Sequence, residues 1–220
     1  MKININPDVL SIFLKLKLIL GEDVFLVGGY VRDYLLGHDS TDLDFAVSCD
    51  PVKVHEIFPQ GLYFPKYGTT TIKINDYHIT LASMRKENDY LDFRHPGHVE
   101  FIKDYKTDAL RRDFTINSLY LENSGMILDP TGSGLADLTA KKLCLIGNAQ
   151  QRLIEDPLRI LRAYRFREEL SFKFDDELSN AIEHEKGLLS YLKPSKIVEE
   201  LNKCPSDSKI KIMNELGINI

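Results

Sequence analysis

Two acidic residues, Asp42 and Asp44, stand two positions apart in residues 41–47, where polar and apolar side chains alternate. This alternation predicts a half-buried β-strand. Side chains at positions i and i+2 of a strand point to the same face, so the two carboxylates would repel each other unless a cation lay between them. Oxygen ligands suit Mg²⁺, which keeps several waters and is completed by substrate phosphates. The pair therefore predicts a magnesium site; the alternative is a solvated strand face.

A turn suited to phosphate comes shortly before these aspartates. Residues 23–27 form a short apolar run that predicts a buried strand, and Gly28 and Gly29 separate it from residues 30–36, which have helical spacing. Glycines let the backbone approach a phosphate closely, and a helix N-terminus offers unpaired N–H groups. Arg32 adds a positive charge. A triphosphate on this turn would lie beside cations held by the aspartates, as in nucleotidyl transfer, although a Gly-Gly turn alone is ordinary turn geometry.

Arg111, Arg112 and Asp113 form a compact charged group ahead of an expected β-hairpin. Adjacent residues cannot share one face of a helix, so at least one of the two arginines is expected to point to solvent or to a ligand. A pair of surface charges is the alternative interpretation of this group.

A second charged group occupies residues 155–165. If a helix begins at Pro157, Arg159 and Arg162 lie three apart on one face. Asp156, at the N-terminal end, can accept hydrogen bonds, and Arg159 can donate a fork of them. An acceptor and a donor held on one rigid face could read the Watson–Crick edge of a base. The alternative is a capped helix with surface arginines.

The elements that must position these residues follow from periodicity, caps and turn residues. The other expected elements are a helix of about 13 residues between Pro7 and Gly21, a helix over residues 52–58, a hairpin of strands 69–74 and 78–84, a polar loop over 85–97, a hairpin of strands 118–121 and 126–128, and helices from residue 149 with breaks at Gly187, Pro194 and Pro205. The order predicts an α+β domain with a mixed, antiparallel-rich sheet over residues 1–140. A small all-helical domain is expected over residues 141–220.

The charge balance limits how nucleic acid could be bound. The 220 residues contain 28 Lys and Arg against 33 Asp and Glu, a net charge of −5. A protein that holds nucleic acid by bulk charge is usually basic, so any RNA binding must be local. The acidic excess lies in the first 140 residues, where a metal site would need it.

The cysteines and the apolar runs bear on the cellular compartment. Cys49, Cys144 and Cys204 form no CxxC pair, which speaks against zinc and against a disulfide framework. The most apolar run, residues 9–20, is too short and too charged to span a bilayer or to serve as a signal peptide. We therefore expect a soluble cytoplasmic protein with no membrane partner.

Four blocks in fixed order give the sequence a family resemblance. FLVGGYVRDYLLG with TDLDFAV, then RRDFTINSLYL, LDPTGSGLADL and EDPLRILRAYRF, resemble the class II tRNA nucleotidyltransferase and bacterial poly(A) polymerase family. KPSKIVEELNK, residues 193–203, resembles a fifth and weaker block. The resemblance implies a nucleotidyltransferase head followed by a helical neck that recognises the base. It also implies CMP and AMP addition to the 3′ end of tRNA without a template, with CTP and ATP as substrates and two Mg²⁺ ions.

The resemblance also implies a role for the residues of each block. Asp42 and Asp44 match the catalytic, metal-binding carboxylates. The residues matching nucleotide-binding positions are Gly28, Gly29, Arg32, Arg111, Arg112, Asp113, Glu155, Asp156, Arg159 and Arg162. Within that set, Asp156 and Arg159 match the pair that recognises the incoming base.

Two further segments match moving parts of the family. Asp129 and Gly134 match a hinge between head and neck. Residues 85–96, with Arg85, Asp92 and Arg94, match a flexible loop that helps to switch from CTP to ATP.

Three features depart from the family pattern. Many members have a glutamate five residues before the arginine that opens the loop, and this chain has Thr80 there. Most members continue beyond the position of Ile220 with body and tail domains that grip tRNA. The poly(A) branch often carries a Gly-Arg-Arg-Phe stretch, where residues 67–70 here read Tyr-Gly-Thr-Thr, as in the CCA branch.

These departures keep alternatives open. One is a specialist that adds A, CC or poly(A); another is a nucleotide- or RNA-binding relative with little catalysis. A third is a catalytic part whose RNA grip comes from a separate chain or a homodimer. In that case Lys193, Lys196 and Lys203 are candidates for salt-sensitive phosphate contacts, or simply a solvated helix face.

Overall fold

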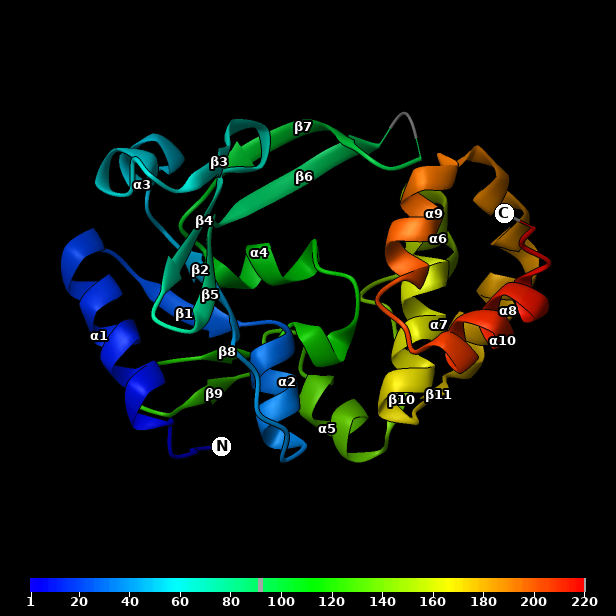
Figure 1. The fold of residues 1–220 in the computed structure, drawn as a ribbon, viewed down its shortest axis with the longest axis horizontal. Helices are drawn as coiled ribbons and strands as arrows, with labels where there is room; N and C mark the ends of the chain where they lie inside the picture. Colours follow the sequence, from blue (N-terminus) through cyan, green and yellow to red (C-terminus); the bar gives the residue numbers. More distant parts are fainter. Residues whose placement is uncertain (91–92, 220) are drawn as a thin grey trace. The chain divides into compact units, whose positions relative to one another are not determined.

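A computed structural model describes residues 1–90 and 93–219 of the chain. The chain divides into two compact units (Figure 1). The N-terminal unit contains residues 1–87, 98–112 and 116–135, and the C-terminal unit contains residues 88–97, 113–115 and 136–220. Asp92, predicted in the flexible loop, lies outside the described residues.

The N-terminal unit is built on a mixed, antiparallel-rich sheet with the strand order β3-β4-β5-β2-β1-β8-β9. β2 and β5 pair in parallel, and the other neighbouring strands pair antiparallel. The strands are β1 (Val24–Val27), β2 (Asp42–Val47), β3 (Leu62–Phe64), β4 (Thr69–Ile74), β5 (Tyr77–Ser83), β8 (Tyr120–Leu121) and β9 (Ile127–Leu128). The predicted sheet is confirmed, and β3 is a strand that the sequence pattern did not indicate.

Local signals in the sequence explain where the helices of this unit begin and end. The helices are α1 (Pro7–Leu20), α2 (Gly29–Leu35), α3 (Pro51–Ile57) and α4 (Tyr105–Leu110), with 3₁₀ turns η1 (Pro65–Tyr67) and η2 (Thr115–Asn117). Asn6 caps α1 by accepting a 2.9 Å hydrogen bond from the Asp8 amide, and Gly21 ends the helix at a φ of 65°. Glycine adopts that conformation with little strain, which is why it commonly ends a helix.

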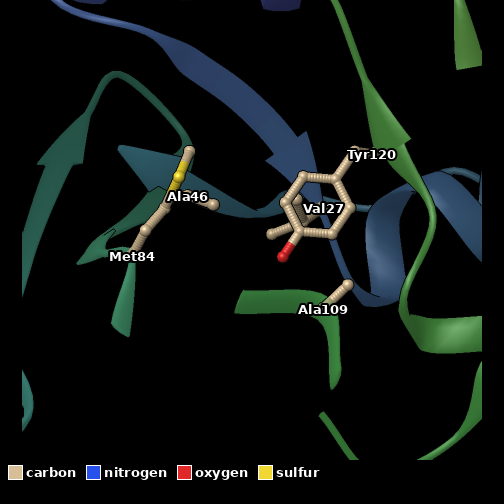
Figure 2. Packing of buried hydrophobic residues seen from close by; sticks show 5 residues of the cluster. All are labelled: Val27, Ala46, Met84, Ala109 and Tyr120. Atoms are coloured by element: carbon tan, nitrogen blue, oxygen red, sulfur yellow. The ribbon is translucent and has the colours of Figure 1, made fainter. Parts of the chain in front are cut away.

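Alternate residues of β2 point to opposite faces of the sheet and pack against different elements. On one face, Phe45 of β2 meets Phe13 of α1 edge to face at 5.2 Å between ring centroids. On the other, Ala46 packs with Val27, Met84, Ala109 and Tyr120 (Figure 2). Ala109 comes from α4, so α1 and α4 lie on opposite sides of β1 and β2 (Figure 1). This packing fixes β2 so that its alternate residues point outward at its N-terminal end.

The loop predicted over residues 85–97 is wrong in its main part. The structure has a two-stranded sheet of β6 (Arg85–Tyr90) and β7 (Pro96–Phe101). β6 reads Arg-Lys-Glu-Asn-Asp-Tyr, without apolar alternation. Backbone hydrogen bonds hold such a ribbon together without burying one face, so hydrophobic periodicity cannot reveal it.

The C-terminal unit is mainly helical. Its elements are α5 (Gly134–Thr139, which begins in the N-terminal unit), α6 (Ala149–Glu155), α7 (Leu158–Leu170), α8 (Asp176–Glu185), η3 (Lys186–Tyr191), α9 (Pro194–Leu201) and α10 (Ser206–Leu216), with strands β10 (Lys142–Leu143) and β11 (Lys173–Phe174). β10 and β11 pair in parallel, so the expectation of an all-helical domain over residues 141–220 is wrong at residues 142–143 and 173–174. Ser171, at a φ of 54°, ends α7 and lets the chain extend.

Two breaks predicted in the helical part are confirmed and one is displaced. Pro194 opens α9, and Pro205 directly precedes α10. Gly187 lies inside η3, one residue after α8 has given way to 3₁₀ geometry. Among residues 1–90 and 93–219, no helix has the length and apolarity needed to cross a membrane.

Candidate active site

The exposed end of β2 presents both predicted aspartates on one face. Asp42 and Asp44 are exposed, whereas Leu43 and Phe45 are buried, as strand alternation requires. The neighbouring strand β5 places Thr80 beside Asp44 in parallel register. Thr80, at the position where many relatives have glutamate, is therefore the immediate neighbour of Asp44 on this face. Where the family resemblance implies a third carboxylate, this face carries a hydroxyl.

The glycine turn lies directly against this face. Gly28 follows β1 with φ 72° and ψ −141°, and α2 begins at Gly29. A Cβ atom added to Gly28 would lie 3.2 Å from Oδ2 of Asp44, so the turn's backbone passes close to that carboxylate. The structure thus brings together the two features that the sequence predicts to hold a triphosphate and its cations.

Replacing Gly28 with alanine should weaken nucleotide binding, because the new Cβ would strain the backbone and crowd Asp44. Strain at such a φ costs about 1–3 kcal/mol, so we expect a rise of about 5- to 150-fold in the Kd for CTP, measured by calorimetry. Gly21→Ala is the matched control, since Gly21 has a φ of 65° and open space around it. An unchanged Kd for Gly28→Ala would contradict this role of the turn.

Arg32 is held rigidly beside the turn. Its Nε and Nη2 donate to the two carboxylate oxygens of Asp33 at 2.7 and 2.9 Å, and Nη1 donates to Oδ1 of Asn117 at 2.8 Å. The guanidinium is buried, and a Cβ on Gly29 would lie 3.6 Å from its Nη2. Asn117 was not predicted as a site residue, although it lies within the block RRDFTIN.

Arg111 and Arg112 share one buried carboxylate, Asp108. Arg111 Nε donates to Asp108 Oδ1 at 2.8 Å, and Arg112 Nη2 donates to Oδ2 at 3.1 Å. The hydroxyl of Tyr120 also donates to Oδ2 at 2.5 Å and accepts from Arg112 Nε at 3.0 Å. Asp108 was not predicted as a site residue. It lies three and four positions before the two arginines, and this spacing indicates contact on a helix.

The surroundings of Asp108 keep it ionised. Burial by itself would raise the pKa of this carboxyl, because Asp108 is 0% exposed, but the charges of Arg111 and Arg112 outweigh burial. Hydrogen bonds from Tyr120 and from the Arg85 amide act in the same direction. The net result is a pKa well below the ordinary range, so the network carries a fixed negative charge between two fixed positive ones.

Arg85, the first residue of the predicted flexible loop, belongs to the same network. Its backbone N–H donates to Asp108 Oδ1 at 3.0 Å. Its side chain donates to Glu87 Oε1 at 2.7 Å and to the Tyr67 carbonyl at 2.9 Å. Glu87 lies 3.6 Å from Arg111 as well. The base of the β6–β7 hairpin is therefore anchored to the two arginines.

In the C-terminal unit, Asp156 and Arg159 flank the junction of α6 and α7. Asp156 ends α6 and accepts a 3.1 Å hydrogen bond from the Leu158 amide. Burial raises the pKa of Asp156, and the charges of Arg159 and Arg94 partly oppose that rise. Arg94 of the predicted loop thus acts electrostatically on Asp156.

Arg159 is only 5% exposed and is held by α6. Its Nη1 donates to the Arg152 carbonyl at 2.5 Å and to Glu155 Oε2 at 3.2 Å, while Arg152 donates to the same oxygen at 2.7 Å. The ring of Tyr90 lies 5.9 Å from the Arg159 guanidinium. Glu155 therefore orients Arg159, and Tyr90 and Arg152 are neighbours that the sequence did not identify.

Arg162 pairs with Asp113, a residue of a different block. Its Nε and Nη2 lie 2.7 and 2.5 Å from Asp113 Oδ2, and its Nη1 lies 3.8 Å from Glu200. Glu200, nearly fully buried in the fifth block, also accepts from Arg165 at 2.7 Å. The block Arg111-Arg112-Asp113 is consequently divided, since its arginines belong to the N-terminal unit and its aspartate to the C-terminal unit.

The remaining predicted residues take part in turns, helix ends or ion pairs. Asp129 accepts from Thr131, Gly132 and the Leu135 amide, which shapes the loop before α5 at Gly134. Two of the lysines proposed for phosphate contacts form ion pairs, Lys196 with Glu199 and Lys203 with Glu200. Lys193 precedes α9 as its N-cap residue.

Within the described residues, the predicted site coincides neither with a group of three metal-ligating side chains nor with a cavity beside α3. Over residues 1–90 and 93–219, no group of three or more His, Cys, Asp and Glu side chains is arranged to hold a metal ion. Any cation at Asp42 and Asp44 would need water or substrate oxygens to complete its shell. A cavity of about 410 Å³ between the end of α3 and β4 is lined by none of the predicted site residues.

Comparison with known proteins identifies relatives of both units. The family model of the poly A polymerase head domain matches residues 24–144. The CCA-adding enzyme of Lactococcus lactis subsp. cremoris is 37% identical over 187 residues, covering 83% of this chain and 46% of the relative. That of Lactobacillus johnsonii is 38% identical over 207 residues, covering 92% and 52%. The chain spans about half the length of the curated relatives it matches.

Solved structures show the same similarity. The CCA-adding enzyme of Bacillus stearothermophilus in complex with CTP superposes with a TM-score of 0.83 at 30% identity, over 98% of this chain and 54% of that one. A tRNA nucleotidyltransferase complexed with a primer tRNA and an incoming ATP analog gives a TM-score of 0.75 at 27% identity, over 93% and 60%. The chain belongs to the poly(A) polymerase head-domain family, which includes the class II CCA-adding enzymes.

Proposed function

We propose that this chain is a template-independent nucleotidyltransferase that adds CMP and AMP to the 3′ end of tRNA. The observation that carries the proposal is the close approach of the Gly28 backbone to Asp44, with Asp42 on the same exposed face of β2. Relatives that match more than nine tenths of this chain are CCA-adding enzymes. Solved structures of relatives contain CTP, ATP, or a primer tRNA with an ATP analog.

Asp42 and Asp44 fit magnesium because they offer hard oxygen donors on one exposed face and leave positions for substrate phosphates and water. Two magnesium ions bound there would lower the pKa of the attacking 3′-hydroxyl and neutralise charge on the leaving pyrophosphate. The 3′-oxygen attacks the α-phosphate of the nucleotide and forms a new P–O bond, while the bond from the α-phosphorus to the oxygen that bridges it to the β-phosphate breaks. Pyrophosphate leaves with that oxygen, and the hydroxyl proton passes to solvent.

The protein's own groups bind and orient the substrates in this proposal. The backbone of Gly28 and Gly29 holds the triphosphate, with Arg32 fixed beside it by Asp33 and Asn117. Arg111 and Arg112, locked by Asp108, neutralise phosphate charge or contact the ribose.

In the C-terminal unit, Asp156 and Arg159 present an acceptor and a donor to the Watson–Crick edge of the incoming base. Glu155 and Arg152 fix the orientation of Arg159. The Arg162–Asp113 pair supports the same helix. We propose residues 1–140 as the catalytic head and residues 141–220 as the base-reading neck.

Thr80 motivates a second candidate, a nucleotide-binding relative with little catalysis. Its hydroxyl stands beside Asp44 where many relatives carry a third carboxylate, so metal affinity would be lower. Calorimetry with ATP and Mg²⁺ together with a pyrophosphate-release assay separates the two. Nucleotide binding without release in the presence of tRNA would favour the binding relative.

The decisive experiment is product analysis with a tRNA that lacks its 3′-terminal CCA. We expect extension by two C residues with CTP alone and by one further A when ATP is added, read by mass spectrometry of the tRNA. Addition of A alone would favour an A-adding specialist, and long A tails would favour a poly(A)-adding enzyme. Either result would overturn CCA addition as the activity of this chain.

A further inference from the structure

The face of the sheet that carries the aspartates continues to the edge strand β3. Strand register places Asp44, Thr80, Thr71 and Leu62 in one row across β2, β5, β4 and β3. Paired residues of neighbouring strands point to the same face, so Leu62 lies on the side of Asp44. By the same register, Phe64 lies in the next row, beyond Thr69.

The residue between them confirms this orientation. Tyr63 stacks on His55 of α3, with ring centroids 4.5 Å apart and an interplanar angle of 12°. It therefore points to the opposite face, which α3 covers. Leu62 and Phe64, its neighbours on either side, must point to the aspartate face.

Polar groups fill the space between the aspartates and the edge. Thr80 and Thr71 carry hydroxyls on this face, and Thr69 beside them donates its hydroxyl to the Tyr67 carbonyl at 3.3 Å. The row of Asp42 continues through His78 to Lys73, both exposed. Hydroxyls and a lysine ammonium are the donors that phosphate and ribose oxygens accept from. This face therefore offers hydrogen bonds and positive charge next to the acidic pair.

The edge itself is apolar and open. Leu62 is 63% exposed and Phe64 is 47% exposed. Lys66 follows shortly after Phe64, its ammonium 5.6 Å from the ring centre of Tyr67. An exposed leucine and phenylalanine on an edge strand are a liability for a soluble sheet, and an occupant that covers them would remove it.

We propose that this surface, defined by Thr80, Thr71, Thr69, Lys73, Leu62 and Phe64, binds the unpaired 3′ end of the RNA substrate. The threonines and Lys73 contact the backbone, and bases stack on Phe64 and Leu62. Aromatic platforms beside positive charge bind single strands in this way. The inference rests on the proposed function, because it starts from the 3′-hydroxyl placed at Asp44.

The dimensions of the surface agree with that occupant. Three strand steps separate Asp44 from Leu62, about 14 Å at ~4.8 Å per step. A few unpaired nucleotides can span this length. A second copy of the chain is a poorer occupant, since β3 has three residues and offers few backbone groups for strand addition.

The test compares RNA affinity of Phe64→Ala and Leu62→Ser with that of the unaltered chain. The probe is a fluorescein-labelled RNA stem-loop with a four-nucleotide unpaired 3′ end, measured by anisotropy, and a blunt stem-loop serves as reference. We expect a rise of about tenfold in Kd for the overhang RNA, little change for the blunt RNA, and an unchanged Kd for CTP. Leu18→Ala, 84% exposed on α1, is the matched control and should bind like the unaltered chain.

A second variant tests the charged part of the surface. Lys73→Ala should lower the slope of log Kd against log salt concentration by about one, because one phosphate contact is lost. Equal affinity of Phe64→Ala and the unaltered chain for the overhang RNA would overturn the proposal. So would gel filtration showing a dimer that Phe64→Ala dissociates, since the surface would then belong to a second copy. These are binding measurements, so they remain informative if no nucleotide is transferred.

Discussion

Asp44→Ala is expected to lower the rate of nucleotide transfer by about 10³-fold or more while the fold is retained. Metal ions at such sites contribute several kcal/mol to the transition state, and each 1.36 kcal/mol is a factor of about ten. Asp44 is exposed, so its removal creates no cavity. The effect should therefore fall on the chemical step.

The measurement is a single-turnover rate of CMP incorporation into tRNA over a range of magnesium concentrations. Asp44→Asn, which keeps the shape and loses the charge, should be similarly slow. Asp76→Ala is a suitable control because Asp76 is an exposed aspartate in the turn between β4 and β5. Circular dichroism should show that all three variants are folded.

Retention of the normal rate by Asp44→Ala would remove Asp44 from the catalytic site. A loss of rate that excess magnesium restores would instead assign Asp44 to metal affinity alone. Both outcomes are separable from loss of RNA binding, which the anisotropy assay measures independently.

The sequence predicted the part of the site that depends on strict local rules. In residues 41–47 the alternation of side chains determined both the strand and the shared face of Asp42 and Asp44. The turn at Gly28 and Gly29 was predicted from the two glycines between a buried strand and a helix, and the structure gives Gly28 a φ of 72°, which glycine adopts without strain. These features follow from backbone geometry, which short windows of sequence specify well.

The sequence failed where structure depends on pairing between distant segments. β3 and β11 have three and two residues, too few for a period to be visible. β6 is entirely polar except for its terminal tyrosine, so its pairing with β7 left no hydrophobic pattern. Short or polar strands are stabilised by their partners, and single-sequence reasoning has no access to those partners.

Asp108 shows the same limit at the level of one side chain. An aspartate three and four residues before two arginines is the spacing of an ordinary surface ion pair on a helix. The fold instead buries this carboxylate completely, because Tyr120 from β8 and the Arg85 amide from β6 close over it. Its burial comes from segments on either side of α4 in the chain.

Asp108→Ala should lower the free energy of unfolding by about 3–5 kcal/mol. Removing one partner of a buried ion pair leaves the other charges uncompensated, and here Arg111 and Arg112 would face each other without their shared carboxylate. Urea unfolding should show the loss as a lower midpoint with an unchanged m-value. Asp104→Ala is the matched control on the same helix, since it removes only an exposed N-cap and should cost about 1 kcal/mol.

The dependence on pH gives this prediction a second, independent signature. The pKa of Asp108 lies below its usual value of 3.8 in the folded chain. The unfolded chain therefore binds the proton of Asp108 more tightly than the folded chain does. The carboxylate charge of Asp108 stabilises the fold above about pH 4, and this stabilisation is lost as the pH falls through the lower pKa of the folded chain. The stability gap between the unaltered chain and Asp108→Asn should accordingly narrow as the pH is lowered below 4. A gap that stays constant down to pH 2 would show that Asp108 acts through packing and not through its charge.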